Sequence, residues 1–169
     1  MWNWIKNLFS DSKEKEEKVK INKWVELSSD DVVSADKELR FRFQLIDGKY
    51  SLIILSGSDR LYRSVYGETT VEGNTGNCYL KTENENFKIM TGRFSCRYPY
   101  TILTIKDVNL SDFLDKDFTK CRIVSRSCYV DTDLDVDECL FSKKLKAIIR
   151  DMLNKYEILT TNPTKDLWI

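Results

Sequence analysis

The chain has 169 residues, with 27 acidic and 27 basic side chains, so its formal net charge is zero. Hydrophobic residues make up 41% and charged residues 32%, a balance typical of a globular protein and unlike a disordered or membrane-embedded chain. Neutrality also removes the overall positive charge of a typical nucleic-acid-binding domain. Histidine is absent, which excludes serine–histidine and cysteine–histidine nucleophile pairs and histidine metal ligands.

Residues 1–19 are predicted to form an N-terminal arm. Its apolar side chains recur at the spacing of an amphipathic helix, and they include Met1, Trp2, Trp4, Ile5, Leu8 and Phe9. Such a helix is typical of docking on a protein or of lying at a membrane surface, where tryptophans sit at the headgroup level. Residues 11–20 are strongly charged, and they fit either a solvated helix or a tether.

A β-hairpin is predicted over residues 39–55, at the start of a single domain that spans residues 20–159. Leu39, Phe41, Phe43 and Leu45 alternate with polar residues, as in a half-buried strand. Asp47-Gly48 suits a two-residue turn, which would place Leu45 opposite Tyr50, Phe43 opposite Leu52 and Phe41 opposite Ile54. Ile46, Ile53 and Leu55 fall on the other face, so we expect a second cover there, either the N-terminal arm or a partner.

The remaining elements follow from alternation and from turn residues. We expect strands at residues 20–27, 61–66, 69–72, 78–81, 87–91, 93–98, 101–106 and 118–130, the last with a bulge near residues 123–124. Residues 28–37 should form a polar turn or short helix, and residues 110–117 a short helix or loop. The best helix covers residues 142–159, where one apolar stripe runs from Leu145 to Tyr156.

This order of elements predicts an α+β fold. The sheet should be mostly antiparallel, with about six to eight strands, and the C-terminal helix should pack on it. An N-terminal amphipathic helical arm precedes this domain, and residues 160–169 form a tail that ends in Leu167, Trp168 and Ile169.

An acidic run comes directly before the C-terminal helix and consists of Asp131, Asp133, Asp135 and Asp137, followed by Glu138. Carboxylates in such a run can hold Ca²⁺ or Mg²⁺. However, Val136 stands where an EF-hand loop needs glycine, and Ser142 where it needs a bidentate glutamate. The alternative is a solvated loop in which Asp135 or Asp137 caps the helix.

Basic and aromatic residues are interleaved in two further stretches. They comprise Arg60, Tyr62, Arg63 and Tyr66, then Arg93, Phe94, Arg97, Tyr98 and Tyr100. This mixture suits stacking and phosphate contact on a single-stranded nucleic acid, although aromatic side chains in strands also serve packing. No RNA-binding signature accompanies it, so nucleic acid is not the expected partner.

The five cysteines are an odd number and contain no C-x-x-C pair, which favours free thiols in a reducing, cytoplasmic setting. The glycine loops lack nucleotide-binding spacing, and no cofactor is expected. The sequence therefore predicts no enzyme.

The leading hypothesis is a non-enzymatic interaction or structural protein, for example an assembly component or a viral or host-directed accessory protein. It would dock on a protein partner, or on a second copy, through Trp2, Trp4, Ile5, Leu8, Phe9, Leu167, Trp168 and Ile169. The first alternative is a peripheral membrane protein anchored by the N-terminal helix. The second is a module that binds single-stranded nucleic acid or a divalent metal.

Overall fold

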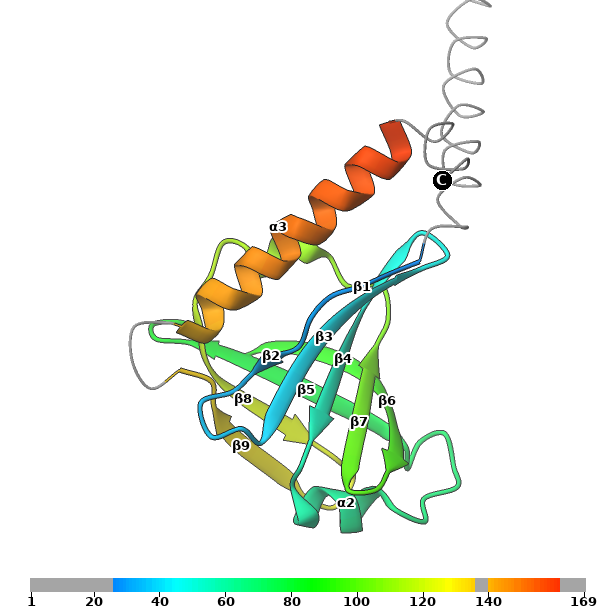
Figure 1. Ribbon diagram of the computed structural model, residues 1–169. Helices are drawn as coiled ribbons and strands as arrows, with labels where there is room; N and C mark the ends of the chain where they lie inside the picture. The colour runs from blue at the N-terminus through cyan, green and yellow to red at the C-terminus, as the bar shows by residue number, and fades with distance from the viewer. Residues whose placement is uncertain (1–25, 136–139, 162–169) are drawn as a thin grey trace, which may run out of the picture.

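The computed structural model describes residues 26–135 and 140–161, and their elements form one antiparallel sheet with two α-helices (Figure 1). The first strands are β1 (Leu27–Ser28), β2 (Val32–Val33), β3 (Leu39–Ile46) and β4 (Lys49–Ser56). After α2 (Asp59–Val65) come β5 (Thr75–Thr82), β6 (Lys88–Arg97) and β7 (Tyr100–Ile105). The 3₁₀ helix η1 (Leu110–Phe113), β8 (Phe118–Val124), β9 (Tyr129–Asp133) and α3 (Leu140–Thr161) complete the described part.

The sheet confirms the predicted fold class. Its strand order is β1-β3-β4-β7-β6-β5-β8-β9, with β2 also paired to β3, and every pairing is antiparallel. The described residues thus contribute nine strands, slightly more than the sequence predicts. The predicted N-terminal arm lies outside the described residues, as does the tail at residues 162–169.

The β3–β4 hairpin has the predicted register. Leu45 pairs with Tyr50, Phe43 with Leu52 and Phe41 with Ile54. Asp47 and Gly48 both adopt positive φ, at 54° and 75°, as a two-residue hairpin turn requires. Here alternation and turn chemistry favour the same register, because a slip by one residue would bring the apolar side chains to the solvent face.

One face of the sheet, the inner face, carries the hydrophobic core, and α3 covers it. Phe41 packs edge-on against Phe141 of α3, with ring centroids 5.2 Å apart, and Phe43 packs similarly against Phe113 of η1 at 5.4 Å. Figure 1 shows α3 running across one end of the sheet, above β2 and β3. The sheet is strongly curved, since the Ala35 N–H at the end of β2 donates to the Leu134 carbonyl, just beyond β9, at 3.2 Å.

The C-terminal helix is longer than predicted and begins at Leu140. Asp135 caps it, because its carboxylate accepts hydrogen bonds from the backbone N–H groups of Phe141 and Ser142, at 2.5 and 3.3 Å. This interaction satisfies donors that an α-helix leaves free in its first turn. Among the described residues, no helix is both long enough and apolar enough to cross a membrane.

The prediction of a strand at residues 61–66 is wrong, because α2 occupies this stretch. The Ser58 hydroxyl accepts a hydrogen bond from the Leu61 N–H at 3.2 Å, and Asp59 and Arg63 form an i,i+4 ion pair at 2.9 Å. Leu61 and Val65, four residues apart, are the side chains that this helix buries. Four-residue spacing matches both a helix and a short strand, and the N-cap decides between them.

Several other predicted elements and boundaries are also wrong. Residues 28–37 are not only a polar turn or helix, because they contain the short strand β2. Residues 118–130 are not one long strand, because β8 ends at Val124 and a turn leads to β9, which starts at Tyr129. Residues 87–91 and 93–98 belong to one strand, β6, which continues through Gly92. No strand forms at residues 69–72, which make a turn instead, and the bulge of β8 lies opposite Lys81 and Thr82.

The opposite face of the sheet, the outer face, carries mostly polar and charged side chains. On β3 it presents Arg40, Arg42, Gln44 and Ile46, which alternate with the four buried residues of the inner face. Ile53 and Leu55 of β4 lie on this face too, partly buried. Neither is part of the buried core under α3, as the sequence predicts, and what covers this face stays a prediction.

Candidate anion-binding cleft

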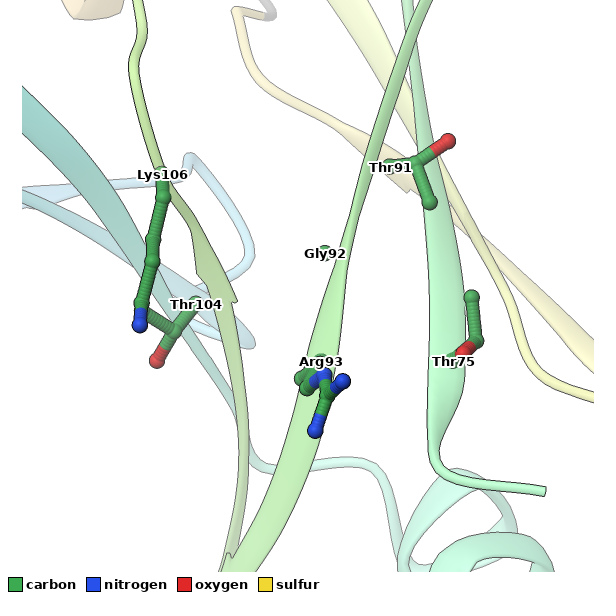
Figure 2. Close-up of a pocket in the computed structure, with 6 residues that line it drawn as sticks. All are labelled: Thr75, Thr91, Gly92, Arg93, Thr104 and Lys106. Carbon is green, nitrogen blue, oxygen red and sulfur yellow. The ribbon is translucent and has the colours of Figure 1, made fainter. Parts of the chain in front are cut away.

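The cleft forms on the outer face where β6 changes neighbours. Residues Lys88 to Arg93 of β6 pair with β5, and residues Arg93 to Arg97 pair with β7. Arg93 lies between Thr75 of β5 and Thr104 of β7, and beyond it β6 and β7 separate, as Figure 2 shows. A cavity of about 570 Å³ opens there, within the size range of small-ligand sites. Its lining consists of Thr75, Thr91, Gly92, Arg93, Thr104 and Lys106.

Gly92 allows this geometry. A Cβ atom at this position would overlap the carbonyl oxygen of Thr104 and Cγ1 of Ile105, so the backbones of β6 and β7 come close here only because the residue is glycine. Gly76 stands opposite Gly92 on β5, and the Phe94 ring occupies the space of its missing side chain. The two glycines therefore mark the point where the sheet bends and the cleft begins.

The lining has two positive charges and no negative one. Among the described residues, no carboxylate forms an ion pair with Arg93 or Lys106. Some other cations of the outer face are paired, for example Arg42 with Asp31 at 2.7 Å and Arg122 with Asp131 at 2.6 Å, whereas Arg40 and Arg97 form no ion pair with a described residue. A guanidinium, an ammonium group and the Thr104 hydroxyl can together donate several hydrogen bonds to an anion, and Arg93 can do so bidentately. The other two threonine hydroxyls of the lining donate within the protein, Thr75 to the Val71 carbonyl and Thr91 to Asn77 Oδ1, both at 2.8 Å.

Two further hollows adjoin this cleft and share Lys106 with it. One, of about 410 Å³, extends toward the β3–β4 hairpin and includes Gln44, Ser51 and Thr104 in its lining. The other, of about 260 Å³, lies toward η1 and includes Lys88, which is paired with Asp112 at 2.7 Å. Lys106 is thus the residue common to all three hollows. Asp107 lines both further hollows but not the cleft, so the cleft is the part of this surface that suits an anion.

A cluster of aromatic side chains lies on the same outer face, with members on β5, directly before β6, and on β9. Tyr79 and Phe87 pack edge-on at 6.2 Å, and the Arg122 guanidinium lies 4.4 Å from the Tyr129 ring centre and 5.7 Å from that of Phe87. We call Tyr79, Phe87 and Tyr129 the outer aromatic cluster. Tyr129 remains 50% exposed, and Ile89, opposite Tyr79 on β6, is 62% exposed. Such exposed apolar surface on a polar face often marks a binding site.

The basic and aromatic residues nominated from the sequence do not form one surface. Arg93 and Arg97 both lie on the outer face of β6, whereas Phe94 between them is buried in the core. Arg60 donates a hydrogen bond to the Tyr129 carbonyl, and Arg63 is paired with Asp59. Only Arg93 of the nominated set lines the cleft.

Three of the four nominated tyrosines, all except Tyr100, meet at the opposite end of β6, beside α2. Tyr62 stacks on Tyr66 at 5.5 Å and meets Tyr98 edge-on at 5.6 Å, while Tyr66 and Tyr98 remain 68% and 82% exposed. Desolvation raises the pKa of Tyr62, and the neighbouring Cys96, Tyr66 and Tyr98 raise it further. Tyr62, Tyr66 and Tyr98 form a second aromatic surface, which we call the α2 tyrosine cluster.

The acidic run serves structural roles in its described part. Asp131 binds Arg122 through both carboxylate oxygens, at 2.6 and 2.9 Å, Asp133 lies 3.9 Å from the Lys120 ammonium group, and Asp135 caps α3. Hydrogen bonds from Arg122 lower the pKa of Asp131. Asp137 lies outside the described residues, and within those residues no three histidine, cysteine, aspartate or glutamate side chains could share a metal ion. A metal bound with Asp137 stays a prediction.

The cysteines of the described residues are free thiols. Cys78 and Cys121 are buried with their sulfur atoms 3.6 Å apart, while Cys96 and Cys128 are partly exposed. Desolvation raises the pKa of the Cys96 thiol. The terminal residues predicted to dock on a partner, from Trp2 to Phe9 and from Leu167 to Ile169, lie outside the described part of the chain.

Most residues of the cleft are missing from the sequence-based nominations. Lys106 and the three threonines carry no motif, and only the strand order brings β5, β6 and β7 together. The alternation of Tyr79 with the buried Cys78 and Leu80 could have indicated that Tyr79 lies on the outer face. No family model matches this sequence, and neither a curated protein nor a solved structure matches it.

Proposed function

We propose that this chain is a non-enzymatic binding protein that holds a phosphate-bearing ligand in the β6–β7 cleft. The observation that carries the proposal is the pair of Arg93 and Lys106, which line a cavity of about 570 Å³ whose lining contains no carboxylate. Unpaired cations in a concave site favour an anion, and the Thr104 hydroxyl can donate to one of its remaining oxygens. The Thr75 and Thr91 hydroxyls already donate to the Val71 carbonyl and to Asn77 Oδ1. Because the cleft is open to solvent, we expect weak binding that salt screens strongly.

The lining also favours binding over catalysis. It offers cations and hydroxyl groups, but no carboxylate or thiol that could act as a general base or activate a threonine.

The test is calorimetric titration of the full-length protein with inorganic pyrophosphate at low ionic strength. The double variant Arg93→Gln/Lys106→Gln should bind pyrophosphate at least about tenfold more weakly, since each charged hydrogen bond contributes roughly 1.5–3 kcal/mol. The matched control is Lys143→Gln/Lys144→Gln, which removes the same charge from the exposed side of α3. Equal loss in both double variants, or no binding to the wild type, would refute the proposal.

We further propose that the tryptophan-bearing ends provide a second contact, with a protein partner. The support is the clustering of Trp2, Trp4 and Trp168 with other apolar residues in otherwise polar termini, because large aromatic side chains dominate interface energies. Deletion of residues 1–10 should abolish association with a co-purified protein, as native mass measurement would detect. Loss of liposome binding on Trp2→Ala/Trp4→Ala would instead favour the membrane-anchored alternative.

A further inference from the structure

The cleft and the outer aromatic cluster are neighbours on one face of the sheet. Thr91 of the cleft lies directly opposite Asn77 of β5, and their side chains share a hydrogen bond of 2.8 Å. Tyr79 follows Asn77 by two residues on the same face. It is therefore the diagonal neighbour of Thr91, and Cα atoms of such neighbours lie about 7–8 Å apart. In the next strand Tyr79 pairs with Arg122, which holds Tyr129. A phosphate-binding surface therefore adjoins an aromatic one.

From this arrangement we infer that the ligand is a single-stranded nucleic acid, an inference that rests on the proposed phosphate binding in the cleft. The sugar-phosphate backbone lies along Arg93 and Lys106, and an adjacent base stacks on the outer aromatic cluster. Stacking on aromatic side chains beside a cationic groove is the general way in which proteins hold single strands without reading their sequence. Arg122 is fixed against Tyr129 by its bidentate ion pair with Asp131 and supports the stacking surface from one side.

The arrangement favours a single strand over other phosphate-bearing partners. In a duplex the bases are stacked on one another, so their faces are not available to Tyr79 or Tyr129. A lipid headgroup would satisfy the cleft but has no π-face for the aromatic cluster. The small number of unpaired cations also matches a weak, salt-dependent contact better than the broad basic surface of a duplex-binding protein.

The experiment compares two fluorescent probes of equal charge by anisotropy: oligothymidine of about 12 nucleotides, within the usual site sizes, and an abasic strand of the same length. The full-length wild type should bind oligothymidine more tightly. Tyr79→Leu/Tyr129→Leu should weaken oligothymidine binding by roughly five- to hundredfold and leave binding of the abasic strand unchanged. Leucine keeps apolar surface on the strands, and unchanged melting temperatures would verify the fold.

The matched control is Tyr66→Leu/Tyr98→Leu, which removes two exposed tyrosines from the α2 tyrosine cluster and should affect neither probe. Arg93→Gln/Lys106→Gln should weaken binding of both probes and reduce the slope of log affinity against log salt by about 0.7 per lost phosphate contact. This third variant separates the contribution of phosphate from that of the bases.

The outcomes distinguish the two proposals. If both probes bind equally and the Tyr79/Tyr129 variant changes nothing, the inference is wrong, whereas the proposed phosphate binding stands provided that the Arg93/Lys106 variant weakens both. If that variant binds pyrophosphate and both probes like the wild type, phosphate binding in the cleft is itself wrong. Binding to phosphatidylserine vesicles without binding to oligothymidine would overturn the inference in favour of a membrane surface.

Discussion

The two faces of the sheet are built from the same strands and do different work. On β3, four inner residues are all buried: Leu39, Phe41, Phe43 and Leu45. The ring of Phe41 packs against α3, and the ring of Phe43 packs against η1. The outer residues of the same strand are mostly polar and at least partly exposed. The comparison teaches that stability resides mainly on the inner face, which leaves the outer side chains free to be selected for binding.

The largest expected effect is on the inner face, at Phe41. This side chain is fully buried and packs edge-on against Phe141, so Phe41→Ala removes a large apolar group and leaves a cavity. We expect a loss of about 3–5 kcal/mol in the free energy of unfolding, measured by urea denaturation. Arg93→Ala on the outer face should change the same quantity by less than about 0.5 kcal/mol.

If Phe41→Ala and Arg93→Ala lost similar amounts of unfolding free energy, the contrast between the two faces would be wrong. The outer face would then contribute to stability as much as the core. A loss at Phe41 well below about 3 kcal/mol would show that α3 repacks over the cavity, since the cost depends on how far a site can collapse.

Gly92 links the two faces and should give the next largest effect. In Gly92→Ala the new Cβ meets backbone atoms of Thr104, which cannot move without shifting β7. We expect a loss of about 1–3 kcal/mol in unfolding free energy, as for other overpacked sites, together with weaker pyrophosphate binding in the cleft. Gly67→Ala is the matched control, because it is strained by its positive φ but has open space around it and lies just after α2, outside the cleft lining. Unimpaired pyrophosphate binding by Gly92→Ala would show that the cleft does not depend on the close approach of β6 and β7.

The inner face was largely predictable from the sequence, and the outer face was not. Alternation and the Asp47-Gly48 turn fixed the hairpin register, and the stripe from Leu145 to Tyr156 identified α3, because both patterns record burial directly. Residues 61–66 were wrongly predicted to form a strand, because a four-residue spacing fits a helix as well as a strand. Only the N-cap at Ser58 distinguishes the helix from the strand.

The candidate cleft depends on which strands become neighbours, and local patterns do not specify this. Thr75, Arg93 and Thr104 form one row across β5, β6 and β7, although they come from segments of the chain as much as 29 residues apart in the printed numbering. Arg93 could be nominated because it lies in a stretch where basic and aromatic residues are interleaved. Lys106 could not be told from any other surface lysine. Whether a cation is paired or free follows from the register of its neighbours, which the sequence alone leaves open.

A small effect on stability is expected where the outer face is already neutralised, at the Arg122–Asp131 pair. Hydrogen bonds from Arg122 lower the pKa of Asp131, so this pair stabilises the fold above the carboxyl's ordinary pKa of about 4. The contribution is lost as pH falls through the lower pKa of the folded state. Since the Asp131 side chain is 51% exposed, it amounts to roughly 0.2–1 kcal/mol at neutral pH.

Asp131→Asn should therefore be slightly less stable than the wild type at pH 7, and the difference in unfolding free energy should shrink to zero in acid. The variant also frees the Arg122 charge beside the outer aromatic cluster, so it should bind oligothymidine more tightly and with a steeper salt dependence, by about 0.7 in slope for one added phosphate contact. Thus one substitution should lower stability and raise affinity. If both the stability and the affinity for oligothymidine fell, Asp131 would matter on this face mainly by holding Arg122 in place for stacking. The positive charge that Asp131 neutralises would then not be what limits binding.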